Sequence, residues 1–268
     1  MRIDIRHQLS FTPPPGTQHA VMQLLLTPQS GPSQTIESWS VEMPGIGNAG
    51  RFKDAFGNVA HLVNQTRPEG TLTVTVKGVV ETVDRHGVLG RPGGEPVPAI
   101  YKRITPLTKA PATLYSKFRN SKESRLDILH GLMARVSEVL GVAEGEGQTQ
   151  MQEDGKQSQS QGVVKAAASA ADYAHGFIGA ARALDIPARY VTGYLAGDAE
   201  SPAAFHAWAE AFDEGLGWIG FDPMLLLCPT DRHVRLAAGL DSQGTQPLRT
   251  VPAGDGVSDL GVTIELAS

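Results

Sequence analysis

The sequence contains one cysteine, Cys228, among 268 residues. A single thiol excludes an intramolecular disulfide and any metal site built on clustered cysteines, and it favours a reducing compartment. No stretch approaches the roughly 18 apolar residues that a membrane-spanning helix needs. The N-terminus, Met1 to His7, alternates charged and apolar residues and lacks the apolar run of a signal peptide. We therefore expect a cytoplasmic protein that does not enter a membrane.

Basic residues are fewer than acidic residues in this sequence. The chain has 23 Lys and Arg against 28 Asp and Glu, a formal net charge of −5, and its basic residues are scattered. This balance argues against nucleic acid as a partner. No His and carboxylate residues recur at ligand spacing in one motif, so we expect no metal and no other cofactor. The composition is otherwise ordinary, with 41% hydrophobic residues, and predicts a folded globular chain.

Three regions differ in their sequence pattern. Over residues 1–85, short alternating or apolar runs are separated by turn-rich pieces, which predicts an N-terminal antiparallel β-sandwich. Residues 86–120 are rich in Gly and Pro and are expected to form a linker. Residues 121–268 would then form a second domain, with an α+β fold.

The second domain begins with a helix and a polar segment. Apolar residues at helical spacing predict a helix over 123–140, with Gly141 as its C-cap. Residues 143–162 carry one apolar side chain of any size and are expected to form a polar loop. This loop could gate a neighbouring cleft or be an insertion without a function, and the sequence leaves both open.

The next segment contains the candidate catalytic residues. An Ala-rich helix is predicted over 170–184, followed by strands over 188–195, 204–212 and 217–223. A helix N-terminus lowers the pKa of a thiol placed on it, and adjacent strands can supply a base and a carboxylate that orients it. His206 and Asp222 lie on the second and third strands, where Asp222 could accept a hydrogen bond from the imidazole.

Four motifs in this order resemble the bacterial transglutaminase-like family. They are Asp172-Tyr-Ala-His175, Ile186-Pro-Ala-Arg-Tyr-Val191, Phe205-His-Ala-Trp-Ala-Glu210 and Gly217-Trp-Ile-Gly-Phe-Asp-Pro223. The likeness extends to Asp54-Ala-Phe-Gly-Asn58 and to the segment from Arg232 to Asp241, so it covers nearly the whole chain. It implies an N-terminal β-domain followed by a papain-like domain with a helix on an antiparallel sheet. It also implies that His206 and Asp222 are the catalytic His and Asp of the family.

The nucleophile departs from the family pattern. The family helix opens Gly-Val-Cys-Gln-Asp-Phe-Ala-His, which places its Cys at Ala170 and its Gln at Ala171. Alanine has no lone pair for attack, and removal of a triad nucleophile costs on the order of 10⁶ in kcat. Because the neighbouring positions differ as well, we favour a natural loss over an engineered Cys-to-Ala trap. Our first hypothesis is therefore a pseudoenzyme, an inactive relative of transglutaminase-like cysteine proteases.

In this hypothesis the His206–Asp222 cleft binds a peptide, an amide side chain or a partner protein, which could be an active transglutaminase-like relative. Ser169, Asp172 and Trp208 are the expected binding residues, and an oligomer is compatible with the sequence. A second hypothesis is a peptidase or amide hydrolase that uses Ser169, Cys228 or a water activated by His206. A third is an interaction scaffold with a blocked cleft.

Each of these residues also has a purely structural explanation. Ser169 is a preferred helix N-cap, and free cysteines such as Cys228 are more often small buried hydrophobes than nucleophiles. His175 lies on a different face of the helix and is interpreted as structural. His206 and Asp222 could persist only as a polar pair that stabilises two strands.

Overall fold

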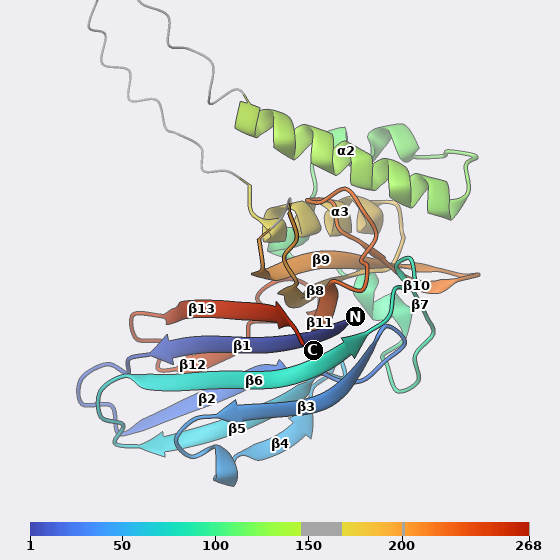
Figure 1. Cartoon of the computed structure of the whole chain (residues 1–268). Coiled ribbons are helices and arrows are strands. Elements are labelled where there is room, and N and C mark those ends of the chain that lie inside the picture. Colours follow the sequence, from blue (N-terminus) through green and yellow to red (C-terminus); the bar gives the residue numbers. More distant parts are fainter. Residues whose placement is uncertain (146–167, 200–201, 268) are drawn as a thin grey trace, which may run out of the picture.

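The computed structural model describes residues 1–145, 168–199 and 202–267 (Figure 1). The described chain is a mixed α and β structure, in which mostly antiparallel sheets are accompanied by few helices. Two sheets of four strands and one of five are formed in these ranges. None of the helices in the described ranges is long and apolar enough to cross a membrane.

The two four-stranded sheets form the N-terminal β-domain. One has the order β13-β1-β6-β3 and the other the order β12-β2-β5-β4. Their strands are β1 (Arg2–Phe11), β2 (His19–Thr27), β3 (Gln34–Glu42), β4 (Gly50–Lys53), β5 (Val59–Thr66), β6 (Leu72–Thr82), β12 (Leu248–Val251) and β13 (Val257–Leu266). Alternating apolar residues such as Ile3 and Ile5 of β1 point into one core that both sheets share. The predicted strands of this region are therefore present.

The C-terminal strands return to this domain. β13 pairs antiparallel with β1, and β12 pairs antiparallel with β2. The sequence analysis placed these strands within 121–268, so the pairing differs from the predicted boundary. The reason is physical: the alternation of Leu260, Val262, Ile264 and Leu266 marks a strand, but such an alternation does not say which distant strand it pairs with.

The five-stranded sheet has the order β11-β8-β9-β10-β7. Its strands are β7 (Val88–Gly90), β8 (Ala188–Leu195), β9 (Ala204–Asp213), β10 (Gly217–Phe221) and β11 (His233–Gly239). β7 lies in the segment expected to be a linker, and it extends the sheet by pairing with β10. The rest of that segment contains short helical turns. These are η2 (Pro98–Lys102), η3 (Pro106–Thr108), α1 (Ala112–Tyr115) and η4 (Ser116–Phe118), while η1 (Ile46–Asn48) belongs to the β-domain.

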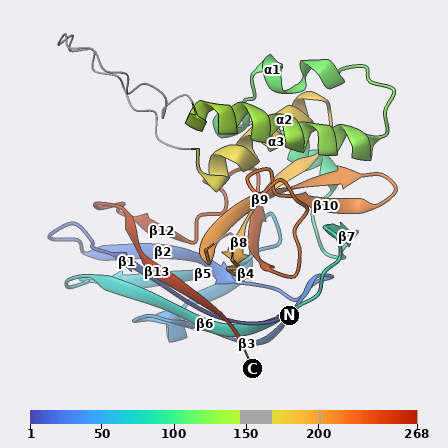
Figure 2. The same cartoon turned by 45° about the horizontal axis from the view of Figure 1, so that its top comes forward.

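Two longer helices cover one face of this sheet. α3 (Ala170–Ala183) packs on β9 through the small side chains of Ala207, Ala209 and Ala211, which share a core with the helix. In both views α2 (Arg125–Gly145) lies on the outer side of α3, away from the sheets (Figures 1 and 2).

The end of α2 differs from the prediction. The helix runs from Arg125 to Gly145, so Gly141 lies inside it and is not its C-cap. A glycine within a helix costs about 1 kcal/mol relative to alanine but does not end the helix, which explains the incorrect prediction. Residues 143–145 of the predicted polar loop belong to α2, and the remainder of the loop lies outside the described residues.

Candidate functional site

The first turn of α3 is closed by a capping box. The hydroxyl of Ser169 accepts a hydrogen bond from the backbone N–H of Asp172 at 3.3 Å and donates to Oδ2 of Asp172 at 2.7 Å. The backbone N–H of Ser169 donates to the same carboxylate oxygen at 2.8 Å. These bonds lower the pKa of Asp172, the side-chain bond from Ser169 most of all. The prediction that Ser169 is the N-cap is confirmed.

Ala170 and Ala171 are the first two residues of the helix. Both are partly buried and pack against the core that α3 shares with the sheet. Neither side chain carries an atom that could attack a carbonyl or hold a proton. The helix start therefore offers backbone N–H groups and a capping carboxylate, but no nucleophile at position 170.

The sheet holds the two predicted polar residues together. His206 lies near the start of β9, and Asp222 directly follows β10, which pairs with β9. Nε2 of His206 lies 2.6 Å from Oδ2 of Asp222, and the two side chains are 6% and 0% exposed. Since side chains alternate along a strand, His206 points to the face opposite Ala207, Ala209 and Ala211.

His233 is a third member of this cluster, and the sequence analysis did not identify it. Its Nε2 lies 3.2 Å from the same oxygen of Asp222, while its Nδ1 accepts the backbone N–H of Thr230 at 3.1 Å. An imidazole nitrogen that accepts an N–H carries no proton, so the proton of His233 is on Nε2 and is donated to Asp222. No motif spacing signals this role, because His233 is brought in by β11.

Asp222 accepts hydrogen bonds at both oxygens. Oδ2 receives His206 and His233, and Oδ1 receives the backbone N–H groups of Met224 at 3.1 Å and Leu225 at 3.2 Å. Burial alone would raise the pKa of Asp222, but these two imidazole bonds prevail and lower it to about 2. An ionised Asp222 requires the proton of His206 on Nε2, which leaves Nδ1 of a neutral His206 with a free lone pair.

Among the described residues, His206, Asp222 and His233 form the group whose potential ligand atoms lie close enough together to hold a metal ion. The atoms are within 4.8 Å of one another. A metal on Nε2 of His233 would require its proton to move to Nδ1, where the N–H of Thr230 already points. The arrangement therefore favours a hydrogen-bonded cluster over a metal site.

Trp208, an expected binding residue, lies beneath the cluster. Its side chain is 2% exposed and packs with Val191 and Ala238. Its ring is perpendicular to that of His233 at a centroid distance of 5.3 Å and 6.4 Å from that of His206. In this arrangement Trp208 supports the imidazoles and presents almost no surface to a ligand.

Cys228 and His175 have local structural partners. Cys228 packs against the core under α3, and burial raises the pKa of its thiol, which disfavours the thiolate needed for attack. Nε2 of His175 accepts the backbone N–H of Ser242 at 3.1 Å, and its ring stacks on Tyr190 at 4.9 Å. Burial lowers the pKa of His175, so the neutral form is favoured.

A second polar cluster, the arginine–glutamate network, lies on the same face of the sheet as His206. Arg189 donates from Nε to Oε2 of Glu210 at 2.5 Å and from Nη1 to Oε2 of Glu95 at 2.8 Å. Arg235 donates from Nε to Oε1 of Glu210 at 2.9 Å. Burial would raise the pKa of Glu210, but the two guanidinium groups lower it. Arg189, Glu210 and Arg235 lie within the segments that carry the family resemblance, where they were given no role, and Glu95 lies outside those segments.

The comparisons with known proteins agree with this architecture. Residues 129–223 match the family described as the transglutaminase-like superfamily, and this segment contains Ala170, His206 and Asp222. Residues 3–81 match the bacterial transglutaminase-like N-terminal region. An uncharacterized protein of Mycobacterium leprae is 26% identical over 263 residues, covering 90% of this chain and 89% of that protein.

A solved structure shows a similar fold. A candidate cysteine protease from Cytophaga hutchinsonii superposes with a TM-score of 0.55 at 21% identity, over 99% of this chain and 89% of that chain. The periplasmic domain of TgpA from Pseudomonas aeruginosa gives a TM-score of 0.22 at 14% identity, over 83% of this chain and 87% of that chain, which is too low to indicate a shared fold. The chain thus combines segments similar to the bacterial transglutaminase-like N-terminal region and to the transglutaminase-like core, and its fold is similar to that of a transglutaminase-like cysteine protease.

Proposed function

We propose that this chain is a transglutaminase-like protein that has lost thiol catalysis and uses the region around His206 and Asp222 to bind a peptide, an amide side chain or a partner protein. The observation that carries the proposal is Ala170 at the first position of α3, where the related family places its cysteine. The imidazole and the carboxylate that the related family pairs with its cysteine are both present here and are hydrogen-bonded to each other.

The proposed binding role follows from the protonation of the cluster. With Nε2 of His206 donating to Asp222, its Nδ1 is a hydrogen-bond acceptor for a donor such as an amide N–H. His206 is 6% exposed, so a ligand would contact a small part of the ring. The capping carboxylate of Asp172 and the hydroxyl of Ser169 are exposed at the start of α3 and could contribute polar contacts.

A hydrolase is the second candidate, and one observation favours it. The free lone pair on Nδ1 of His206 is the feature that a general base needs, so an activated water could replace the missing thiol. The two substitute nucleophiles are less well placed. The hydroxyl of Ser169 is engaged with Asp172, and burial disfavours the thiolate of Cys228.

Turnover on a panel of peptides and glutamine amides tests the proposal. We expect no turnover by the natural chain, and turnover by the variant Ala170→Cys with Ala171→Gln. Addition of His206→Ala to that variant should abolish its turnover, because the thiol then lacks a base.

The natural chain with Lys122→Met is the matched control, since Lys122 is exposed and lies in the connection between η4 and α2. Turnover by the natural chain that disappears in His206→Ala and persists in Lys122→Met would contradict loss of catalysis and establish the hydrolase. In that case Ser169→Ala and Cys228→Ser show which group is the nucleophile. Loss of turnover in one variant identifies the residue that it removes, and turnover that persists in both variants identifies water.

A further inference from the structure

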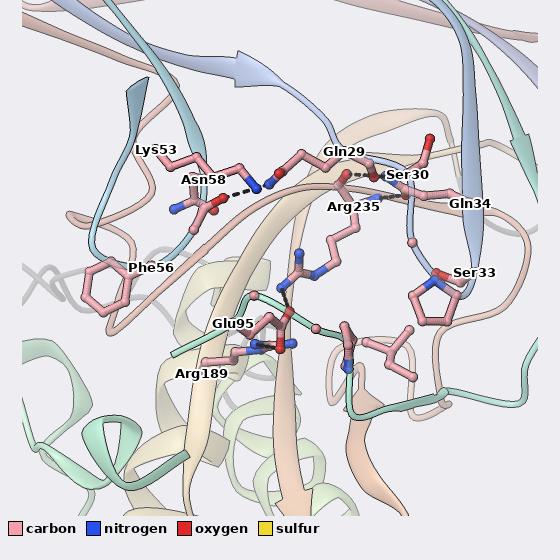
Figure 3. A pocket seen from close by; sticks show the side chains of 17 residues that line it. Gln29, Ser30, Ser33, Gln34, Lys53, Phe56, Asn58, Glu95, Arg189 and Arg235 are labelled. Atoms are coloured by element: carbon pink, nitrogen blue, oxygen red, sulfur yellow. Dashed lines mark hydrogen bonds and ion pairs between the residues drawn. The ribbon is translucent and has the colours of Figure 1, made fainter. Parts of the chain in front are cut away.

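A cavity of about 110 Å³ lies where the N-terminal β-domain meets the five-stranded sheet (Figure 3). Its walls are formed by the segment 29–34, the end of β4 with the turn after it, β7, the connection 92–95, and the strands β8 and β11. Neither His206 nor Asp222 is among its lining residues, and none of the lining residues is part of the proposed peptide or amide site. The cavity is therefore a separate feature of the molecule.

One of the cations that line the cavity, Lys53, has no ion-pair partner among the described residues. Lys53, Arg189 and Arg235 line it together with one acid, Glu95. Glu210 lies beneath them and binds both guanidinium groups. Two carboxylates thus balance two guanidinium groups, and the ammonium group of Lys53 has no described carboxylate within ion-pair distance. Asp54, the acid next to this turn, accepts the backbone N–H groups of Phe56 and Asn58 and the side-chain amide of Asn58, so Lys53 is the cation available to an anion.

Nη1 of Arg235 is also available as a hydrogen-bond donor. Its Nε and Nη2 face Glu210, at 2.9 and 3.4 Å, and Nη2 lies 3.8 Å from Glu95. Nη1 takes part in none of these contacts, and the side chain is 23% exposed. Figure 3 shows its guanidinium group between Glu95 and the segment that carries Gln29 and Ser30. Because Arg235 is held by a buried carboxylate, this donor is fixed in place before any ligand arrives.

The remaining wall of the cavity consists of glycines, which have no side chain, and of apolar side chains. A methyl group added at Gly57, which has φ +84°, would lie 3.8 Å from the carbonyl oxygen of Gly94, while one added at Gly93 or Gly94 would meet no atom within 4 Å. The turn and the connection therefore face each other with open space on the cavity side. Phe56, Leu89 and Pro92 supply apolar surface. A ligand with one charged and one apolar part matches such a lining.

We infer that this cavity binds a small organic carboxylate, with its carboxylate between Lys53 and Nη1 of Arg235 and its apolar part against Phe56 and Pro92. A planar carboxylate can present one negatively charged oxygen to each cation, whereas a neutral amide of the same shape has an NH2 donor in place of one oxygen. A site of this kind would join the β-domain to the transglutaminase-like core, because Lys53 and Arg235 belong to different parts of the fold.

Binding of benzoate to the full chain tests the inference, with benzamide as a neutral probe of the same shape and inorganic phosphate as a second anion. In a two-dimensional NMR titration we expect saturable shifts around Gly57 and Gly94 with benzoate, at least tenfold weaker binding of benzamide, and weaker benzoate binding in 0.5 M sodium chloride than at about 0.05 M. Lys53→Met should weaken benzoate binding about tenfold, whereas Lys53→Arg and the control Lys122→Met should leave it within about twofold.

Three outcomes would overturn the inference. They are the absence of saturable benzoate binding, equal binding of benzoate and benzamide, and benzoate binding that Lys53→Met leaves unchanged. Phosphate binding that is tighter than benzoate binding would replace the carboxylate with a phosphate as the ligand class. All readouts are binding shifts, so they are independent of whether the chain has any turnover.

Discussion

The start of α3 and the sheet that carries His206 differ in what they have kept. At the helix start, Ala170 and Ala171 occupy the positions to which the proposed correspondence with the transglutaminase-like family assigns Cys and Gln, and the polar side chains of Ser169 and Asp172 cap the helix. On the sheet, His206, Asp222 and His233 form a buried cluster with defined proton positions. The polar groups at the helix start thus serve to cap the helix, whereas those on the sheet form a hydrogen-bonded cluster around an imidazole.

The difference shows why a fold and an activity are separate conclusions. A helix needs only a cap and apolar contacts, so alanines at its first turn leave it intact. The sheet cluster is different, because a buried carboxylate without its donors would be costly. Stability alone is therefore a sufficient reason for the His206–Asp222 pair, and ligand-binding measurements on His206 variants separate it from the proposed binding role.

The largest expected effect concerns the arginine–glutamate network on the sheet side. Arg189→Met removes two of the hydrogen bonds to Glu210 and Glu95 and leaves buried negative charge with one guanidinium group. We expect a loss of about 3 to 5 kcal/mol in the free energy of unfolding, measured by urea denaturation. The double variant with Glu210→Gln should lose less than the single variant, and a loss under about 1 kcal/mol in the single variant would contradict the role of the network.

Asp222→Asn should have the next largest effect. Asp222 has a pKa of about 2 in the folded chain against an ordinary value of 3.8, so its ionised form stabilises the fold at neutral pH. The lowered folded pKa means that this stability is present above about pH 4 and is lost as the pH falls toward 2. We expect Asp222→Asn to cost about 2 to 3 kcal/mol at pH 7.

The control for this prediction is the pH dependence itself. The difference between Asp222→Asn and the natural chain should shrink as urea denaturation is repeated from pH 5 down to pH 3. A difference that stays constant over this range would show that the carboxylate charge is not what stabilises the cluster.

Ser169→Ala should have the smallest effect of the three. It removes the hydroxyl that accepts the N–H of Asp172, so we expect a loss of about 1 kcal/mol in the free energy of unfolding. Ser169→Asp can cap the helix in the same way and should recover part of the loss. If Ser169→Ala leaves the free energy of unfolding unchanged, the capping box does not stabilise the fold. The Ser169 hydroxyl would then again be a candidate nucleophile.

Local features of the site could be predicted from the sequence. Ser169 as the N-cap and the strands that carry His206 and Asp222 follow from short-range patterns, and the hairpin of β9 and β10 brings the pair together because it is local. His233 and the pairing of β12 and β13 with the β-domain could not be predicted in this way. They depend on contacts between residues far apart in the chain, and the apolar alternation of β13 marks a strand without specifying its partner.

The end of α2 and the charged cavity were missed for related reasons. A glycine such as Gly141 has the same local appearance inside a helix as at its end, and only tertiary packing decides between the two. Lys53, Glu95 and Arg235 lie in three different parts of the sequence, and only the packing of the β-domain against the sheet brings them to one cavity.

The reactivity of a thiol introduced by Ala170→Cys, in a Cys228→Ser background, is the most direct test of the central claim that the scaffold is intact and only the nucleophile is missing. The rate of alkylation by iodoacetamide would be measured between pH 4 and pH 10. We predict a thiol pKa of about 3.5 to 7.5, because of the helix start and His206, which rises toward 8.5 when His206→Ala is added. A pKa near 8.5 that does not respond to His206→Ala would contradict the claim, because position 170 would then lie outside the reach of the His206 cluster.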